Sequence, residues 1–241
     1  MKIGAIIQAR MGSTRLPGKV LADICGKPAL QRVIERVQAV KGLDTIVVAQ
    51  PAAAYSQEIS RVAAKCRLEE LSLAAVQEDD VLSRYTYTAT KLQLDVVMRI
   101  TADCPLLDPT ICEQVLLEYL ISAIKRLPYD YVSNTQPPTF PDGLDCEVFS
   151  FEALESAHQK ATSSYDREHV TPYLYKLGSR FKKATLFNVR DESHHRWTLD
   201  TQSDLEWIRS IYSILGDGIF GKDEIMELLA ERPELARTLP R

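Results

Sequence analysis

The feature that most constrains the fold is an alternation, over the first 135 residues, between short apolar runs and longer amphipathic segments. The longer segments repeat their apolar residues at helical spacing, as Leu30, Val33, Ile34 and Val37 do. Such alternation is typical of a mostly parallel, Rossmann-like sheet with helices on both faces, so we predict the α/β class. The pattern predicts strands over 2–9, 44–49, 72–76, 95–101 and 129–133, and helices over 28–40, 55–67, 80–93 and 109–126.

The pattern changes after Asn134, because the residues that follow have the proline and glycine density of a loop. We predict a single domain over residues 1–241, in which residues 1–135 form the α/β core and 191–241 return to it. Residues 136–190 are expected to leave the sheet as a lid or dimerisation arm. The expected elements after the core are helices over 151–162, 165–177, 203–215 and 222–231, and strands near 145–149 and 183–189.

The charge balance excludes some classes of partner. The chain has 29 Lys and Arg against 33 Asp and Glu, a formal net charge of −4, so no global basic field favours nucleic acid or an anionic membrane. The apolar run at residues 1–7 is too short for a signal peptide core or a membrane span. We therefore expect a cytoplasmic protein with neither nucleic acid nor membrane as a partner.

A basic, glycine-containing segment over residues 8–19 directly follows the first predicted strand. It has three cationic residues, two glycines and no acidic residue. Glycine permits close approach of the backbone, and Arg10, Arg15 and Lys19 can neutralise a triphosphate. Ligands bind at the carboxyl ends of strands in open α/β sheets, so we predict a phosphate-binding loop and a nucleotide-binding core.

This loop has two other interpretations. Its ending, Gly18-Lys19, resembles a Walker A loop, but five residues separate Gly12 from Gly18 and Val20 replaces the required hydroxyl residue. A phosphotransferase kinase is therefore the weakest candidate. The other alternative is an exposed basic turn.

Two aspartates follow apolar runs and are candidate metal ligands. Asp103 ends the run at 95–101, and Asp200 ends the run that begins at Arg196, just before a predicted helix. A carboxylate at the carboxyl edge of a strand is well placed to hold a divalent cation over bound phosphates. Asp103 could instead cap a turn, and Asp200 is favoured because a second acid is needed. Ser203 is expected to cap the following helix, and Asp204 to favour its positive end.

These segments together resemble the sugar nucleotidyltransferases, and most closely the cytidylyltransferases of the spore coat polysaccharide biosynthesis protein F type and the related acylneuraminate cytidylyltransferases. The likeness covers nearly the whole chain. It implies the nucleotide-diphospho-sugar transferase fold, a Mg²⁺-dependent reaction of CTP with a sugar or sugar phosphate, pyrophosphate release and a homodimer. The segments that carry it are residues 8–19, 78–84, 99–106, 141–149, 166–173 and 199–201.

The resemblance also implies roles for individual residues. The phosphate roles fall to Arg10, Arg15 and Lys19, the metal to Asp103 and Asp200, and the base segment to Asp80 and Arg84. The remaining nucleotide contacts that it implies are Gln8, Ala9, Met11, Gly12 and Ser13. The acceptor side would be built from Asp142, Asp145, Glu147, Arg167, Glu168 and His169, partly by the dimer partner in related enzymes.

Several alternatives stay open. An alternative interpretation of residues 167–169 is a solvated helix start, with Asp166 as its cap. His194 and His195 lack the spacing of a metal site, so we interpret them as surface residues. The phosphate and metal residues do not identify the base, which leaves GTP, dTTP and UTP as rivals to CTP, and a catalytically silent nucleotide-binding relative as a further alternative.

Overall fold

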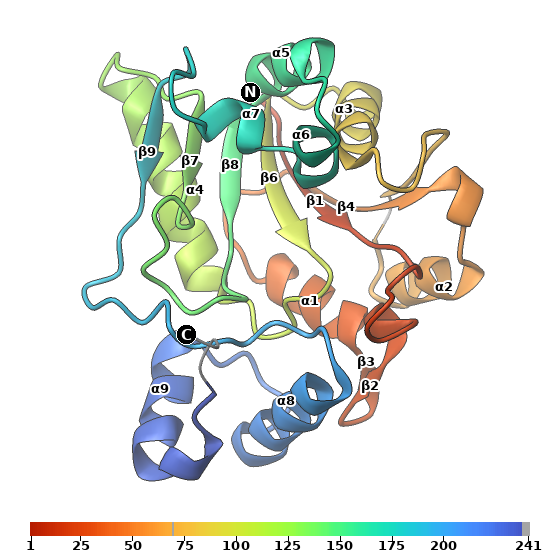
Figure 1. Cartoon of the computed structure of the whole chain (residues 1–241), viewed down its shortest axis with the longest axis vertical. Coiled ribbons are helices and arrows are strands. Elements are labelled where there is room, and N and C mark those ends of the chain that lie inside the picture. Colours follow the sequence, from red (N-terminus) through yellow and green to blue (C-terminus); the bar gives the residue numbers. More distant parts are fainter. Residues whose placement is uncertain (69, 238–241) are drawn as a thin grey trace.

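The structure is a computed structural model that describes residues 1–68 and 70–237 (Figure 1). Its strands are β1 (Ile3–Gln8), β4 (Thr45–Pro51), β5 (Glu70–Ala74), β6 (Val96–Thr101), β7 (Tyr131–Ser133), β8 (Glu147–Ser150) and β9 (Lys183–Thr185), with a small hairpin of β2 (Asp23–Ile24) and β3 (Lys27–Pro28). The seven larger strands form one sheet in the order β5-β4-β1-β6-β8-β7-β9. β8 runs antiparallel to both neighbours, and the other pairs are parallel, which confirms the predicted mostly parallel α/β sheet.

Helices cover both faces of the sheet. One face is covered by α1 (Ala29–Gln38), α2 (Gln57–Lys65) and α4 (Pro109–Ile124), and the other by α3 (Val81–Leu92), α5 (Phe151–Lys160), α6 (Ser164–His169) and α7 (Pro172–Tyr175). At the end of the chain, α8 (Gln202–Leu215) and α9 (Lys222–Glu231) pack together around a separate apolar cluster that includes Trp197 and Trp207. These two helices lie at one end of the sheet (Figure 1).

The central strands are apolar on both faces, which is why they read as continuous hydrophobic runs in the sequence. In β1, Ile3, Ala5 and Ile7 are buried against the side of α1 and α4, whereas Ile6 is buried against α3. β6 alternates in the same way. This double burial fixes the carboxyl ends of β1 and β6 side by side, where the basic loop and Asp103 begin.

The predicted excursion over 136–190 is wrong in part, because strands from this segment join the sheet. β8 lies between β6 and β7, and β9 extends the sheet beyond β7. Within residues 136–190, the segments that leave the sheet are the loop before β8 and the helical stretch from α5 to α7. Residues 136–190 therefore belong partly to the sheet and partly to the segments outside it, and are not a separate arm.

Three local predictions are also corrected. The predicted helix over 165–177 is broken into α6 and α7, because Val170 has a positive φ of 70° and Pro172 cannot continue the hydrogen-bonded ladder. The residues before Asp200 do not form the expected strand, and Arg196 makes only an isolated bridge with Asp142. The N-cap of α8 is Thr201, not Ser203, and it forms a capping box with Asp204.

Gly143 brings two distant segments of the chain together. Its φ is +110°, and a Cβ atom there would lie 2.8 Å from the backbone carbon of Trp197. A backbone hydrogen bond also joins the two segments next to Gly143, from the N–H of Trp197 to the carbonyl of Asp142 at 2.7 Å. Glycine at this position therefore allows the residues on either side of Gly143 to pack directly against the chain that leads to Asp200.

Within the described part of the chain, no helix is both long enough and apolar enough to cross a membrane. The predicted homodimer remains a prediction.

Candidate active site

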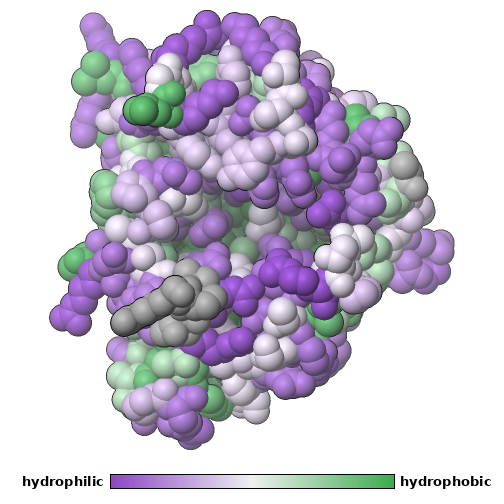
Figure 2. Space-filling model, viewed as in Figure 1, coloured by the Kyte–Doolittle hydropathy of each residue, from purple (hydrophilic) through white to green (hydrophobic). Residues whose placement is uncertain are grey.

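A cavity opens at the carboxyl ends of β1 and β6, where the sequence placed the phosphate-binding loop. Figure 2 shows this face of the molecule hollowed near its middle, with hydrophilic residues around the hollow. Fourteen of the predicted site residues line the cavity: Gln8, Ala9, Arg10, Gly12, Ser13, Arg15, Lys19, Arg84, Asp103, Asp145, Glu147, Glu168, His169 and Asp200. The structure therefore brings most of the predicted nucleotide, metal and acceptor residues to one place.

The basic loop is folded back on itself at its first turn. The carbonyl of Met11 accepts the N–H groups of Ser13 at 2.9 Å and Gly18 at 3.3 Å. Gly18 has a left-handed φ of 69° and leads into the short 3₁₀ turn that starts at Lys19. The side chain of Met11 packs against the core, and Met11 does not line the cavity, so the cavity lining does not support the nucleotide contact predicted for it.

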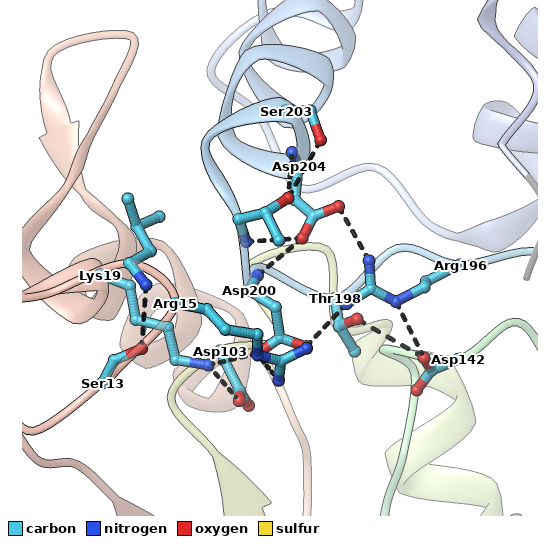
Figure 3. A network of polar contacts seen from close by, with 12 residues as sticks. Ser13, Arg15, Lys19, Asp103, Asp142, Arg196, Thr198, Asp200, Ser203 and Asp204 are labelled. Carbon is cyan, nitrogen blue, oxygen red and sulfur yellow. Dashed lines mark hydrogen bonds and ion pairs between the residues drawn. The ribbon is translucent and has the colours of Figure 1, made fainter.

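Lys19 joins the two predicted metal ligands (Figure 3). Its Nζ lies 2.7 Å from Oδ2 of Asp103 and 2.8 Å from Oδ1 of Asp200. The backbone makes the same connection, because Leu199 N–H donates to the carbonyl of Asp103 at 2.8 Å. The two carboxylates, 97 positions apart in the sequence, therefore face one ammonium group.

The surrounding charges keep Asp200 and Lys19 ionised. Burial by itself would raise the pKa of Asp200, but hydrogen bonds and charge from Lys19, with further charge from Arg15 and Arg196, hold the pKa below its ordinary value. Burial opposes the charged form of Lys19, yet Asp103 and Asp200 raise its pKa above the ordinary value. Asp200 and Lys19 are therefore both charged near neutral pH.

Arg196 positions Asp200, and the sequence analysis did not single it out. Its guanidinium lies 2.7 Å from Oδ2 of Asp200, 2.9 Å from Oδ1 of Asp204 and 3.9 Å from Oδ2 of Asp142. Asp204 is buried and also pairs with Arg237 at 2.8 Å. The signal in the sequence is the spacing of Arg196, Asp200 and Asp204 at four-residue intervals.

Replacement of Arg196 by methionine is expected to lower the free energy of unfolding by about 2 kcal/mol, because it removes one of the two arginine partners of the buried Asp204. Urea unfolding followed by circular dichroism would measure this. Arg61→Met is the matched control, since Arg61 is exposed on α2. An Arg196 variant that unfolds at the wild-type urea concentration would contradict this role.

The cavity wall on the side of β6 away from β1 is built from β8 and the residues before it. Glu147 accepts hydrogen bonds from the hydroxyls of Tyr131 and Thr171 and pairs with Arg99, so both of its oxygens are engaged. Arg99 also lines the cavity. In the sequence it stands out as the one charged residue of a mostly apolar strand, and this is the signal that could have indicated its role.

Asp145 differs from Glu147 because its carboxyl makes no hydrogen bond to any described residue. The turn that presents it is held by Asn134, which donates to the carbonyl of Leu144 at 2.7 Å and accepts the N–H of Cys146 at 2.9 Å. Burial, together with the negative charges of Asp142 and Glu147, raises the pKa of Asp145 to about 7. Asp145 is thus a cavity carboxyl that can hold or release a proton near neutral pH.

Asp80 and Arg167 bind each other and do not line the cavity. Asp80 caps α3, and its Oδ2 lies 2.8 Å from Nη2 of Arg167. The carboxylate of Asp80 and the guanidinium of Arg167 neutralise each other. The structure therefore does not support Asp80 as a base contact or Arg167 as an acceptor contact. Asp142 also lies outside the lining, against Arg196.

Three predicted residues from this region, Arg84, Glu168 and His169, do line the cavity. Arg84 is buried and donates to the carbonyl of Glu78 at 2.5 Å. Glu168 pairs with Arg10 at 3.7 Å across the cavity mouth. Further lining residues that sequence reasoning missed are Thr101, Cys104, Thr135, Gln136, Tyr165, Thr171, Tyr175 and Thr198.

The donor set at the Lys19 end fits a magnesium ion bound together with phosphates. Among residues 1–68 and 70–237 there is no group of three or more His, Cys, Asp or Glu side chains that could hold a metal ion. Two carboxylates, Asp103 and Asp200, are nonetheless the kind of set that Mg²⁺ uses when substrate phosphates supply its other ligands. The metal remains a prediction.

The comparison with protein families decides the class of the chain. A model of the cytidylyltransferase family matches residues 4–230. The chain belongs to this family. The resemblance drawn from the sequence is therefore confirmed.

Two relatives and one solved structure place the chain among cytidylyltransferase-like proteins. It is 39% identical over 183 residues to an uncharacterized protein of Methanocaldococcus jannaschii. The aligned region covers 76% of this chain and 70% of the relative. It is 30% identical over 243 residues to the spore coat polysaccharide biosynthesis protein SpsF of Bacillus subtilis, over 96% of this chain and 95% of the relative. A cytidylyltransferase structure from Leptospira borgpetersenii superposes with a TM-score of 0.91 at 30% identity, and all of both chains is covered.

Proposed function

We propose that this cytidylyltransferase-family chain transfers CMP from CTP to a hydroxyl or phosphate oxygen of a sugar and releases pyrophosphate. The observation that carries the proposal is the cavity in which the basic loop, the Asp103–Asp200 pair and an acid-lined wall face one another. The name of the Bacillus subtilis relative, which refers to polysaccharide biosynthesis, supports a sugar as the acceptor.

In the proposed reaction the acceptor oxygen attacks the α-phosphorus of CTP. A new phosphorus–oxygen bond forms, the bond from the α-phosphorus to the bridging oxygen breaks, and its electron pair leaves with pyrophosphate. Lys19 and Arg15 would bind the phosphate oxygens and neutralise the charge that develops on the leaving group. Positioning and electrostatic stabilisation would supply most of the catalysis.

Asp103 and Asp200 would hold a magnesium ion, which when bound would supply positive charge next to the phosphates. Asp145, on the wall formed by β8 and the residues before it, would accept the proton when the acceptor is a sugar hydroxyl. Glu147 and Arg99 would form a fixed surface beside the acceptor, because their charges already compensate each other.

The proposed base preference can be tested by calorimetry with magnesium and each nucleoside triphosphate. CTP is expected to bind roughly ten-fold to hundred-fold more tightly than UTP, because a buried acceptor meant for the cytosine amino group would face a carbonyl in uracil. Purine triphosphates are expected to bind more weakly because of their size. Equal affinity for CTP and UTP, or tighter binding of GTP or dTTP, would contradict the proposed preference for CTP.

A further inference from the structure

The Asp103–Asp200 pair is already neutralised by cationic side chains. Both oxygens of Asp200 are engaged, Oδ1 by Lys19 and by Arg15 at 2.9 Å, and Oδ2 by Arg196. Oδ2 of Asp103 accepts from Lys19, whereas Oδ1 has a distant contact of 3.8 Å with the thiol of Cys104. Three of the four carboxylate oxygens thus face a cationic group.

Lys19 is the central cation of this arrangement. Its side chain is 14% exposed and bridges the two acids, whereas the side chain of Arg15 is 61% exposed and reaches only Asp200. An exposed ion pair such as that of Arg15 contributes little, because water and salt screen it. An ammonium group within hydrogen-bonding distance of both acids occupies the space and the charge that a divalent cation would need.

We propose that the ammonium group of Lys19 is a resident counter-cation, which occupies the Asp103–Asp200 pair in the nucleotide-free protein and leaves it when a triphosphate draws the lysine away. This inference rests on the proposed nucleotidyl transfer, in which Lys19 binds phosphate. Lys19 begins the 3₁₀ turn that closes the basic loop, and Arg15 lies on the loop itself, so their side chains can turn toward phosphates without a change in the sheet.

The consequence is a coupling between the two ligands. A triphosphate that takes Lys19 leaves Asp103 without its cationic partner and removes the shared ammonium group from Asp200. A cation at those carboxylates in turn leaves Lys19 available to the triphosphate. Each ligand then raises the affinity for the other by the same factor. The nucleotide-free protein should accordingly bind a divalent cation weakly, although it has both carboxylates in place.

Mn²⁺ binding to the full-length, nucleotide-free protein, followed by electron paramagnetic resonance of the free ion, tests the inference without any need for activity. Lys19→Met is expected to lower the Kd for Mn²⁺ about ten-fold, a typical size for a coupling between sites. Lys19→Arg, which keeps the charge, should show no gain. Lys19→Met/Asp103→Asn should lose the gain, because the uncovered carboxylate is gone.

Lys27→Met is the matched control. Lys27 also lies between two carboxylates, 2.9 Å from Glu35 and 2.8 Å from Asp217, but it is not part of the cavity lining. Its removal should not raise Mn²⁺ affinity, since Arg32 still pairs with Asp217. Thermal unfolding would verify that each variant is folded, and Lys19→Gln provides a second neutral substitution.

The inference is overturned if neither neutral Lys19 variant binds Mn²⁺ more tightly, if the double variant keeps the gain, or if Lys27→Met gains as much. Failure of the proposed function would appear elsewhere, as an absence of CTP preference in calorimetry. The two failures are distinguishable, because the Mn²⁺ measurement contains no nucleotide.

Discussion

Asp103→Asn is expected to reduce turnover roughly a hundred-fold to a thousand-fold, because an amide of similar size lacks the charge that a hard divalent cation requires. The fold should be retained. Leu199 donates to the backbone carbonyl of residue 103, which the substitution does not change, and the asparagine carbonyl can still accept from Lys19. Pyrophosphate release at a series of magnesium concentrations would measure the loss and the higher magnesium requirement.

Asp223→Asn is the control for this experiment, because the side chain of Asp223 is 82% exposed at the start of α9. Asp200→Asn should show a similar loss of turnover, with an added effect on stability from its three cationic partners. A normal magnesium titration in the Asp103 variant would remove Asp103 from the proposed metal site. A normal titration in the Asp200 variant would move the second ligand elsewhere.

Asp145→Asn is expected to lower kcat/KM for a sugar hydroxyl acceptor by roughly a hundred-fold to ten-thousand-fold, the usual contribution of a general base. In the wild-type protein kcat/KM should rise as the pH passes through about 7, where the carboxyl loses its proton. The charged groups around Asp145 are Asp142, Glu147, Asp103 and Arg99, and the acids among them oppose its ionisation. The variant should lack this rise in rate.

Stability gives a second measurement that does not depend on catalysis. The pKa of Asp145 is raised to about 7 in the folded protein and is about 3.9 in an unfolded chain. The folded state therefore holds this proton more tightly, so the contribution of Asp145 to stability falls as the pH rises from about 4 to about 7. Asp145→Asn should unfold at a higher temperature than the wild type at pH 8, and the difference should shrink toward pH 4.

The two measurements separate the possible results. A variant that is more stable at pH 8 and slow at every pH supports Asp145 as the proton acceptor. A variant that keeps the wild-type rate and pH profile would contradict that role, and the proton would then leave by another group or the acceptor oxygen would belong to a phosphate. Asp223→Asn again controls for the loss of one carboxylate from the surface.

The phosphate and metal candidates could be placed from the sequence because one physical rule governs them. The carboxyl ends of neighbouring parallel strands meet at one edge, and β1 and β6 are such neighbours. The basic loop and Asp103 therefore had to lie near each other once the strands were identified. Asp200 lies in the cavity near Asp103, as its predicted role requires, although the strand expected before it is absent from the described chain. A backbone hydrogen bond from Leu199 to Asp103 holds this segment in place instead.

The rest of the site depends on tertiary pairings that hydrophobic periodicity does not reveal. Asp80 and Arg167 are polar residues near helix starts in the sequence, and nothing local indicates that they neutralise each other. Likewise, Arg196 acquires its role from three acids that the fold brings around it. The four residues of β8 are too short a run for their pattern to show that they enter the sheet between β6 and β7.

The place of β8 has a consequence for the order in which the chain can acquire its structure during synthesis. β6 and β7 both leave the ribosome before β8, yet in the finished sheet each pairs with β8 and not with the other. Until residue 150 has been made, the edge of β6 has no native partner on that side, and β7 has none on the side that faces β6. A nascent chain at that stage carries an unpaired apolar strand edge, the kind of surface on which chaperones act and from which aggregation starts.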